Sequence, residues 1–197
     1  MEKQLIISIS REYGSGGHLI AEKLAKIFEL PIYDHNLIDH VFDDDVNVDA
    51  WKSSDEKPRT FGFSRSVSGC TNSSEHTLAQ LQFQFLKDKA KAGESFVVVG
   101  RCSEMILREF DGLIPIFVLG DRPCKIKRLQ EIRGFSEKEA KAAMARHDKY
   151  RKRYHNSYCD FKWGDSRGDD ICINSSRLGI DGTTAFLEQY IRQRMGE

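Results

Sequence analysis

The sequence lacks the features of membrane-inserted, secreted and zinc-ribbon proteins. No apolar run approaches the roughly 20 residues that a membrane-spanning helix needs. The apolar N-terminal segment has no small-residue cleavage site and leads straight into a glycine-rich turn, so we expect a strand there and not a signal peptide. The five cysteines are scattered and form no Cys-x-x-Cys pair. This argues against a zinc ribbon or a disulfide framework and fits a reducing, cytoplasmic compartment.

The chain also has no net charge, because 30 basic residues balance 30 acidic ones. The charges are unevenly distributed. Residues 34–56 hold eight acidic residues and one basic residue, whereas residues 121–162 hold thirteen basic residues and six acidic ones. A basic segment can bind polyanions such as nucleotide phosphates or nucleic acid, or it can be a solvated helix face. Composition leaves these alternatives open.

The hydrophobic pattern predicts alternating strands and helices, and 197 residues are enough for one sizeable core. We expect a short helix at residues 35–42 and a mobile Ser-, Gly- and Thr-rich segment at residues 53–74. Because the strands are continuously apolar, the pattern favours an α/β fold with a parallel sheet covered on both faces. The predicted strands are residues 4–10, 30–34, 96–100, 113–119 and 170–174, and the predicted helices are residues 19–28, 77–92, 121–132, 136 to beyond 150, and 182–195.

A glycine-rich turn, Arg11 to His18, joins the first strand to the first helix. In such a turn backbone N–H groups approach phosphate oxygens, and the helix N-terminus adds positive potential. The full nucleotide motif is G-x-x-x-x-G-K-[ST], in which lysine reaches the β- and γ-phosphates and the hydroxyl binds magnesium. Here Gly17 stands at the lysine position and His18 at the hydroxyl position.

Two hypotheses follow for this turn. Either Arg11 or a later arginine supplies the missing cation, and Ser15 or a water molecule helps to hold the metal ion. Alternatively, the turn has lost nucleotide chemistry and only connects a strand to a helix. The loop alone does not separate them. The candidate nucleotide-binding residues are Arg11, Gly14, Ser15, Gly16, Gly17 and His18.

Five segments form a combined pattern that is more specific than any one motif: ISREYGSGG, YDHNLI, VVVGRCSEMIL, RGFSEKEAKAAMARHDKYRKRYH and CDFKWGDSRGDDICINSSRLGIDG. Together they resemble the cytidylate kinase-like family, which is related to the P-loop nucleoside monophosphate kinases. The resemblance covers nearly the whole chain apart from residues 43–75 or so. It implies a single domain over residues 1–197 with a three-layer P-loop NTPase fold and five parallel strands. It also implies an acceptor-binding insertion at residues 35–92 and a lid at residues 128–160, with ATP and Mg²⁺ as cofactors.

The resemblance also assigns residues around the acceptor. Asp34 ends the second strand, where cytidylate kinases place an aspartate near the acceptor and magnesium; it is also a suitable helix N-cap. Arg101 follows the third strand, where the family's arginine meets the acceptor phosphate. The family's next residue is aspartate, whereas this chain has Cys102, which is either a reactive thiol or a packed side chain.

Further candidates lie in the basic segment. Arg128 and Arg133 flank the predicted lid turn, where arginines are suited to the charge that develops in phosphoryl transfer; both can also be helix-surface residues. Asp148 and Arg151 resemble lid residues that contact the acceptor. They are three residues apart on a helix, so they can also form an ion pair.

The leading hypothesis is a kinase that transfers a phosphoryl group from ATP to a nucleoside monophosphate or a similar small acceptor. The alternative is a non-catalytic nucleotide- or phosphate-binding module. We expect no membrane or nucleic-acid partner, because the basic segment coincides with the lid. The histidines show no His-x-x-x-His pattern, so we predict no metal site made of protein ligands.

Overall fold

Five parallel strands form one sheet in the order β2-β3-β1-β4-β5 in the computed structural model, which describes residues 3–34 and 74–196. In the centre, Ile6 of β1 lies opposite both Phe96 of β3 and Leu113 of β4. The parallel sheet and its helices confirm the predicted P-loop NTPase fold. The strands are β1 (Ile6–Arg11), β2 (Ile32–Tyr33), β3 (Phe96–Val99), β4 (Leu113–Leu119) and β5 (Ile171–Asn174).

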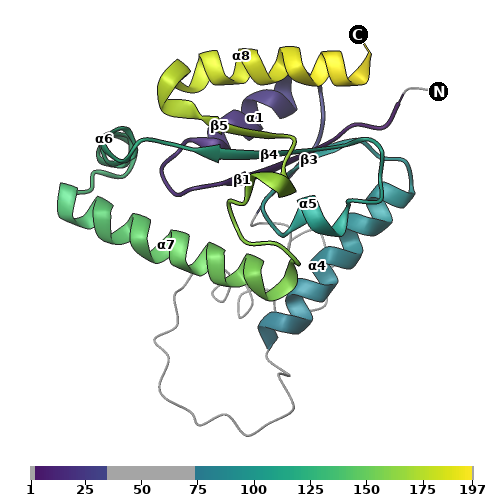
Figure 1. The fold of residues 1–197 in the computed structure, drawn as a ribbon, viewed down its shortest axis with the longest axis horizontal. Helices are drawn as coiled ribbons and strands as arrows, with labels where there is room; N and C mark the ends of the chain where they lie inside the picture. The colour runs from purple at the N-terminus through teal and green to yellow at the C-terminus, as the bar shows by residue number, and fades with distance from the viewer. Residues whose placement is uncertain (1–2, 35–73, 197) are drawn as a thin grey trace, which may run out of the picture.

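Helices cover both faces of the sheet, as the continuously apolar strands predict. Figure 1 shows α1 (Gly17–Ile27) and α8 (Ser175–Met195) above the sheet, with α4 (Ser74–Lys91), α5 (Ser103–Ile106) and α7 (Glu137–Tyr158) below it. Side chains alternate along β1, so Ile7 and Ile9 pack in the core beneath α1 and α8, whereas Ile6 packs in the core against α4 and α5. None of the described helices is long and apolar enough to cross a bilayer.

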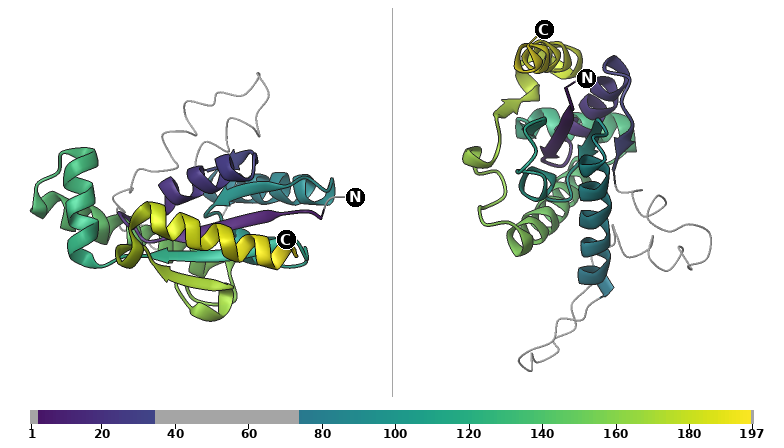
Figure 2. Two further views of the ribbon diagram at one scale, coloured as in Figure 1. Left: turned by 90° about the horizontal axis from the view of Figure 1, so that it is seen from above. Right: turned by 90° about the vertical axis from the view of Figure 1, so that its right-hand side faces the viewer.

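The helix α6 (Arg122–Arg133) and the start of α7 form a hairpin at the carboxyl end of the sheet. Figure 2 shows this end lying opposite the two chain termini. Gly134 ends α6 in the left-handed conformation with φ 67°, which glycine adopts without strain. Ser136 then begins α7 with a capping box to Glu139, as the Ser-x-x-Glu spacing predicts. The hairpin turns α7 back across the ends of the strands.

The predicted strands and the helices around them are present, with two differences. The last helix begins earlier than predicted, at Ser175, because Asn174 caps it, and its course breaks at Gly179 with φ 69°. The four-residue helix α5 was not predicted, because one helical turn is too short to show periodicity. The predicted helix at residues 35–42 and mobile segment at residues 53–74 lie outside the described residues, apart from Ser74, and so does the insertion up to residue 73.

Candidate functional site

The loop between β1 and α1 is a tight turn closed by its own hydrogen bonds. Gly14 and Gly16 have φ of 81° and 84°, and Gly16 is the N-cap of α1 without a side chain to cap it. The buried Ser15 hydroxyl donates to the carbonyl of Glu12 at 2.8 Å and accepts from the N–H of Gly17 at 3.4 Å. Ser15 therefore braces the loop from inside. The start of α1 keeps the form of an anion site, with no side-chain cap among the described residues.

The structure explains why glycine stands at the lysine position of the motif. A Cβ atom on Gly17 would lie 2.6 Å from the Cβ of Arg11, so no side chain fits there unless Arg11 moves. A cation reaches the loop from α6 instead. Nη1 of Arg128 donates to the carbonyl of Gly14 at 2.6 Å, and its guanidinium lies against Gly16. This placement supports the hypothesis that a later arginine supplies the positive charge.

A buried ion pair that sequence reasoning missed holds the loop to α6. Nζ of Lys125 lies 2.7 Å from Oε2 of Glu12, and the same oxygen accepts from the N–H of Gly120 at 3.2 Å. Lys125 is only 6% exposed, so Glu12 compensates its charge where water does not. The available sequence signal was the four-residue spacing of Lys125 and Leu129, the two buried residues of α6.

The helix α7 holds the loop from the other side. Oδ1 of Asp148 accepts from the N–H of Tyr13 at 2.6 Å, and Nη1 of Arg151 donates to the carbonyl of Arg11 at 3.3 Å. The ring of His147 stacks on Tyr13 with a centroid distance of 4.1 Å. Burial raises the pKa of Asp148, and the bond from Tyr13 opposes this shift. Asp148 and Arg151 lie 4.0 Å apart, as their spacing predicts, but both contact the loop as well.

An arginine-rich pocket lies where β1, β3 and α7 meet. Its volume is about 90 Å³. None of the described residues that line it is acidic, so it is electrostatically suited to an anion. Its charged and aromatic lining residues are Arg11, Arg101, Arg146, Arg151, His147, His155, Tyr150, Tyr154 and Trp163.

A strained turn brings Arg101 to this pocket. Gly100, Arg101 and Cys102 follow β3 with φ of 78°, 63° and 55°, all in the left-handed region. Only glycine enters this region without strain, so Arg101 and Cys102 each cost about 1 kcal/mol or more. The Ser103 hydroxyl donates to the Gly100 carbonyl at 2.8 Å and fixes the turn. Strain of this kind is common where a binding side chain must be positioned.

Two other predicted residues lie apart from the pocket lining. Asp34 ends β2, and its Oδ2 lies 3.8 Å from Nε2 of His18 at the start of α1. Asp34 is thus beside the loop, where a carboxylate can bind Mg²⁺. Arg133 is exposed on the last turn of α6 and is not among the residues that line the pocket.

The strand order, the glycine-rich loop before α1 and the α6–α7 hairpin define a P-loop kinase fold. Among proteins with this fold, the chain belongs to the cytidylate kinase-like family, whose model matches residues 6–177. A solved structure of an uncharacterized protein from Eubacterium ventriosum ATCC 27560 is 40% identical, with a TM-score of 0.76 over 95% of this chain and 98% of that one.

More distant structures share the fold alone. Shikimate kinase from Bacteroides thetaiotaomicron is 12% identical, with a TM-score of 0.57 over 95% of this chain and 98% of that one. A gluconokinase from Sinorhizobium meliloti 1021 is 12% identical, with a TM-score of 0.53 over 100% of this chain and 94% of that one. No curated protein matched the chain. These likenesses place the chain in a fold that is used by kinases of small molecules.

Proposed function

We propose that this protein is an ATP-dependent kinase that phosphorylates a small acceptor with an anionic group, such as a nucleoside monophosphate. The observation that carries the proposal is the pocket between β3 and α7, where four arginines meet beside the glycine-rich loop. Phosphoryl transfer needs little covalent chemistry from the protein, because positioning and charge stabilisation lower its barrier. An arginine-lined pocket next to a phosphate loop supplies both.

The loop supports the ATP half of the proposal. Gly14 and Gly16 let the backbone approach an anion closely, and the start of α1 adds positive potential. Arg128 would hold the phosphates in place of the motif's lysine, and Asp34 would hold magnesium. Magnesium supplies charge neutralisation to the transferred phosphoryl group when it is bound. These side chains orient the nucleotide while α6 and α7 fix the loop through Lys125 and Asp148.

The pocket supports the acceptor half. The pocket volume of about 90 Å³ is far below the roughly 300 Å³ of an ordinary ligand site, so the pocket accommodates one end of an acceptor. Guanidinium groups bind phosphate or carboxylate with paired hydrogen bonds, and Arg101 and Arg151 approach the cavity from opposite elements. The anionic end of the acceptor would lie here, with its hydroxyl or phosphate directed toward the loop.

The test is phosphorus NMR of the purified chain with Mg-ATP and a panel of nucleosides, nucleoside monophosphates, shikimate and gluconate. We expect ADP and a new phosphoryl signal with one acceptor class, and loss of that signal in Arg101→Ala. A matched control is Arg122→Ala, because Arg122 is an exposed arginine outside the pocket lining and is not a candidate site residue. ATP that stays intact with every acceptor, or turnover that survives in Arg101→Ala, contradicts the proposal.

A second candidate, a non-catalytic phosphate-binding module, is favoured by the occupied polar groups of the loop. The N–H of Tyr13 donates to Asp148, and the ammonium group of Lys125 pairs with Glu12. Without these partners, the N–H of Tyr13 and the ammonium group of Lys125 could bind nucleotide phosphates. Isothermal titration calorimetry separates the candidates, since tight ATP binding without any turnover would indicate a binding module.

A further inference from the structure

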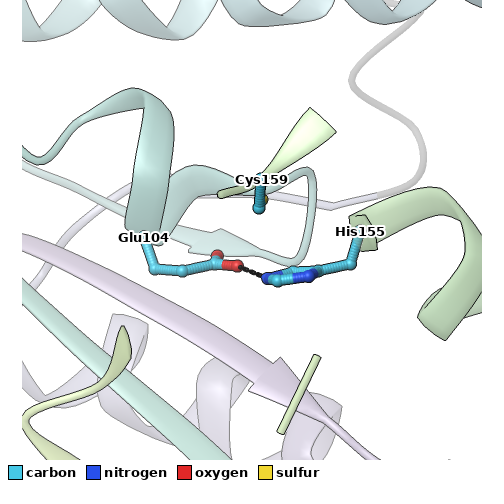
Figure 3. Close-up of side chains that lie close together, drawn as sticks. All are labelled: Glu104, His155 and Cys159. Atoms are coloured by element: carbon cyan, nitrogen blue, oxygen red, sulfur yellow. Dashed lines mark ion pairs between the residues drawn. The ribbon is translucent and has the colours of Figure 1, made fainter. Parts of the chain in front are cut away.

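A carboxylate, an imidazole and a thiol meet beside the pocket, in Glu104 of α5, His155 of α7 and Cys159 at the end of α7. Nε2 of His155 lies 2.8 Å from Oε1 of Glu104, and Figure 3 shows the carboxylate pointing at the ring. The ligand atoms of the three residues all lie within 4.8 Å of one another. The Glu104 and His155 side chains are only 2% and 6% exposed. Such burial is unusual for charged groups unless they are paired or bind a metal.

A fourth ligand-type residue lies against this group. Cys102 is 3% exposed, and its thiol lies beside that of Cys159. Its left-handed backbone, with φ of 55°, follows that of Arg101, so the strained turn that positions Arg101 also positions this thiol. Cys102 and His155 both line the pocket, which gives an ion a route to the group from outside.

The donor set has the chemistry of a zinc site. Thiolate sulfur, imidazole nitrogen and carboxylate oxygen are the ligands of tetrahedral Zn²⁺, with bonds of about 2.0–2.3 Å that place ligand atoms roughly 3–4 Å apart. The atoms of Glu104, His155 and Cys159 need to move only slightly to reach that spacing. With neutral imidazole, one carboxylate and one thiolate, the three ligands cancel the charge of the ion.

A separate observation at the same place is an unsatisfied buried carboxylate oxygen. Oδ1 of Asp169 is buried without a hydrogen-bond partner among the described residues. Burial raises the pKa of Asp169 to about 7, and the charges of Glu104 and His155 act on it as well. Carboxylates next to metal-bound histidines commonly orient the ligands from outside the coordination sphere. Nδ1 of His155 lies 3.4 Å from Oδ1 of Asn156, so Asn156 would orient the ring in this way, while Asp169 would add a negative charge nearby.

We propose that Glu104, His155, Cys159 and Cys102 bind one Zn²⁺ ion with tetrahedral coordination. The ion ties the carboxyl end of α7 to the turn after β3, beside the arginine pocket. The site requires neither ATP nor an acceptor, so it stands or falls separately from the proposed kinase activity.

The test is cobalt substitution of chelator-treated, phosphine-reduced protein, followed by competition with zinc. We expect one Co²⁺ per chain, d–d bands of tetrahedral cobalt in the visible range and a thiolate-to-cobalt band in the near ultraviolet. Zn²⁺ should remove these bands at one equivalent. Cys159→Ser should weaken affinity at least roughly 100-fold and remove about half of the thiolate band, and Cys102→Ser should remove a similar share.

The matched control is Cys124→Ser, because Cys124 is an exposed cysteine on α6. This variant should bind cobalt like the unmodified chain, and circular dichroism of the metal-free proteins should show that all variants fold. If the unmodified protein shows no thiolate-to-cobalt band, the proposal is wrong. Cys159→Ser binding as tightly as Cys124→Ser would also overturn the proposal, and an unchanged band in Cys102→Ser would overturn the four-ligand set.

Discussion

The helix α7 contributes to two groups of charged side chains, and the two groups differ in how their charges are compensated. At the glycine-rich loop, Asp148 and Arg151 bind backbone groups and leave the arginine-lined cavity open. One to two turns further along, His155 and Cys159 belong to a buried group in which the imidazole of His155 pairs with the carboxylate of Glu104 away from water. A solvent-accessible pocket with an excess of positive charge attracts an anionic ligand. A buried group whose charges are paired has room only for a small ion.

The two groups share one face of a helix. His147, Arg151, His155 and Cys159 are spaced four residues apart, which places them along one stripe of α7. The stripe contacts the loop at its beginning and α5 at its end. A single helix, α7, therefore positions the side chains of both groups.

The largest effect is expected at the cation above the loop. Arg128→Met should lower kcat/KM roughly 10²–10³-fold, because it removes the charge that, in the proposed function, holds the ATP phosphates at the loop. Arg122→Met changes the same residue type on the exposed first turn of the same helix and should have little effect. Steady-state kinetics with the acceptor found by phosphorus NMR measures both. Equal losses in the two variants would show that the total positive charge of α6 matters, and that the contact between Arg128 and Gly14 does not.

The second prediction concerns the ion pair beneath the loop. Glu12→Gln leaves the buried Lys125 without its anion, so the free energy of unfolding should fall by roughly 2–4 kcal/mol. Urea denaturation measures this change. The double variant Glu12→Gln, Lys125→Met removes both charges and should regain most of the loss. A double variant as unstable as the single one would show that the loss does not come from the uncompensated charge of Lys125.

The third prediction tests the geometry of the pocket. Arg101→Lys keeps the charge but loses the planar pair of donors, so KM for the acceptor should rise about tenfold while kcat changes less. Arg146→Lys is the comparison, because Arg146 lines the same pocket from an exposed position. Initial-rate kinetics across acceptor concentrations separates the two parameters. If both variants behave alike, the strained turn at Arg101 gives no advantage over an ordinary helix position.

The smallest effect is expected at Asp169, near the buried group. Burial raises its pKa from 3.8 to about 7, so its contribution to stability is complete at low pH and is lost as the pH rises through about 7. Asp169→Asn does not ionise, so in chelator-treated protein the variant should be more stable by roughly 1–2 kcal/mol at pH 8, relative to the difference at pH 4. Denaturant melts at the two pH values measure this. A difference that does not change with pH would show that Asp169 is well solvated.

Much of the fold was predictable, because the hydrophobic pattern of a long segment indicates whether it forms a helix or a strand. The capping box of α7 and the continuous apolar strands indicated both the elements and the parallel sheet. The site was predictable only where a motif is local. The loop and Arg101 follow strands directly, so their place at the carboxyl edge follows from the topology.

Contacts between distant segments were not predictable from the residues alone. Nothing in the sequence states that Lys125 meets Glu12, or that Asp148 binds the N–H of Tyr13, because both contacts depend on the angle at which the α6–α7 hairpin packs. Glu104 and His155 are also far apart in the chain. The spacing His155-x-x-x-Cys159 on one helix was the only local signal of the buried group, and a search for paired histidines passes over it.

The close contact between Gly17 and Arg11 has a consequence for the history of the loop. A lysine at position 17 would collide with the Arg11 side chain, so the standard loop cannot be regained by that one substitution. The contact is with the Cβ atom of Arg11, which every residue except glycine has, so a smaller side chain at position 11 would not relieve it. A lysine at position 17 requires glycine at position 11 or a shift of the backbone, and glycine at position 11 would remove one arginine from the pocket. Packing therefore couples the form of the phosphate loop to the charge of the neighbouring pocket.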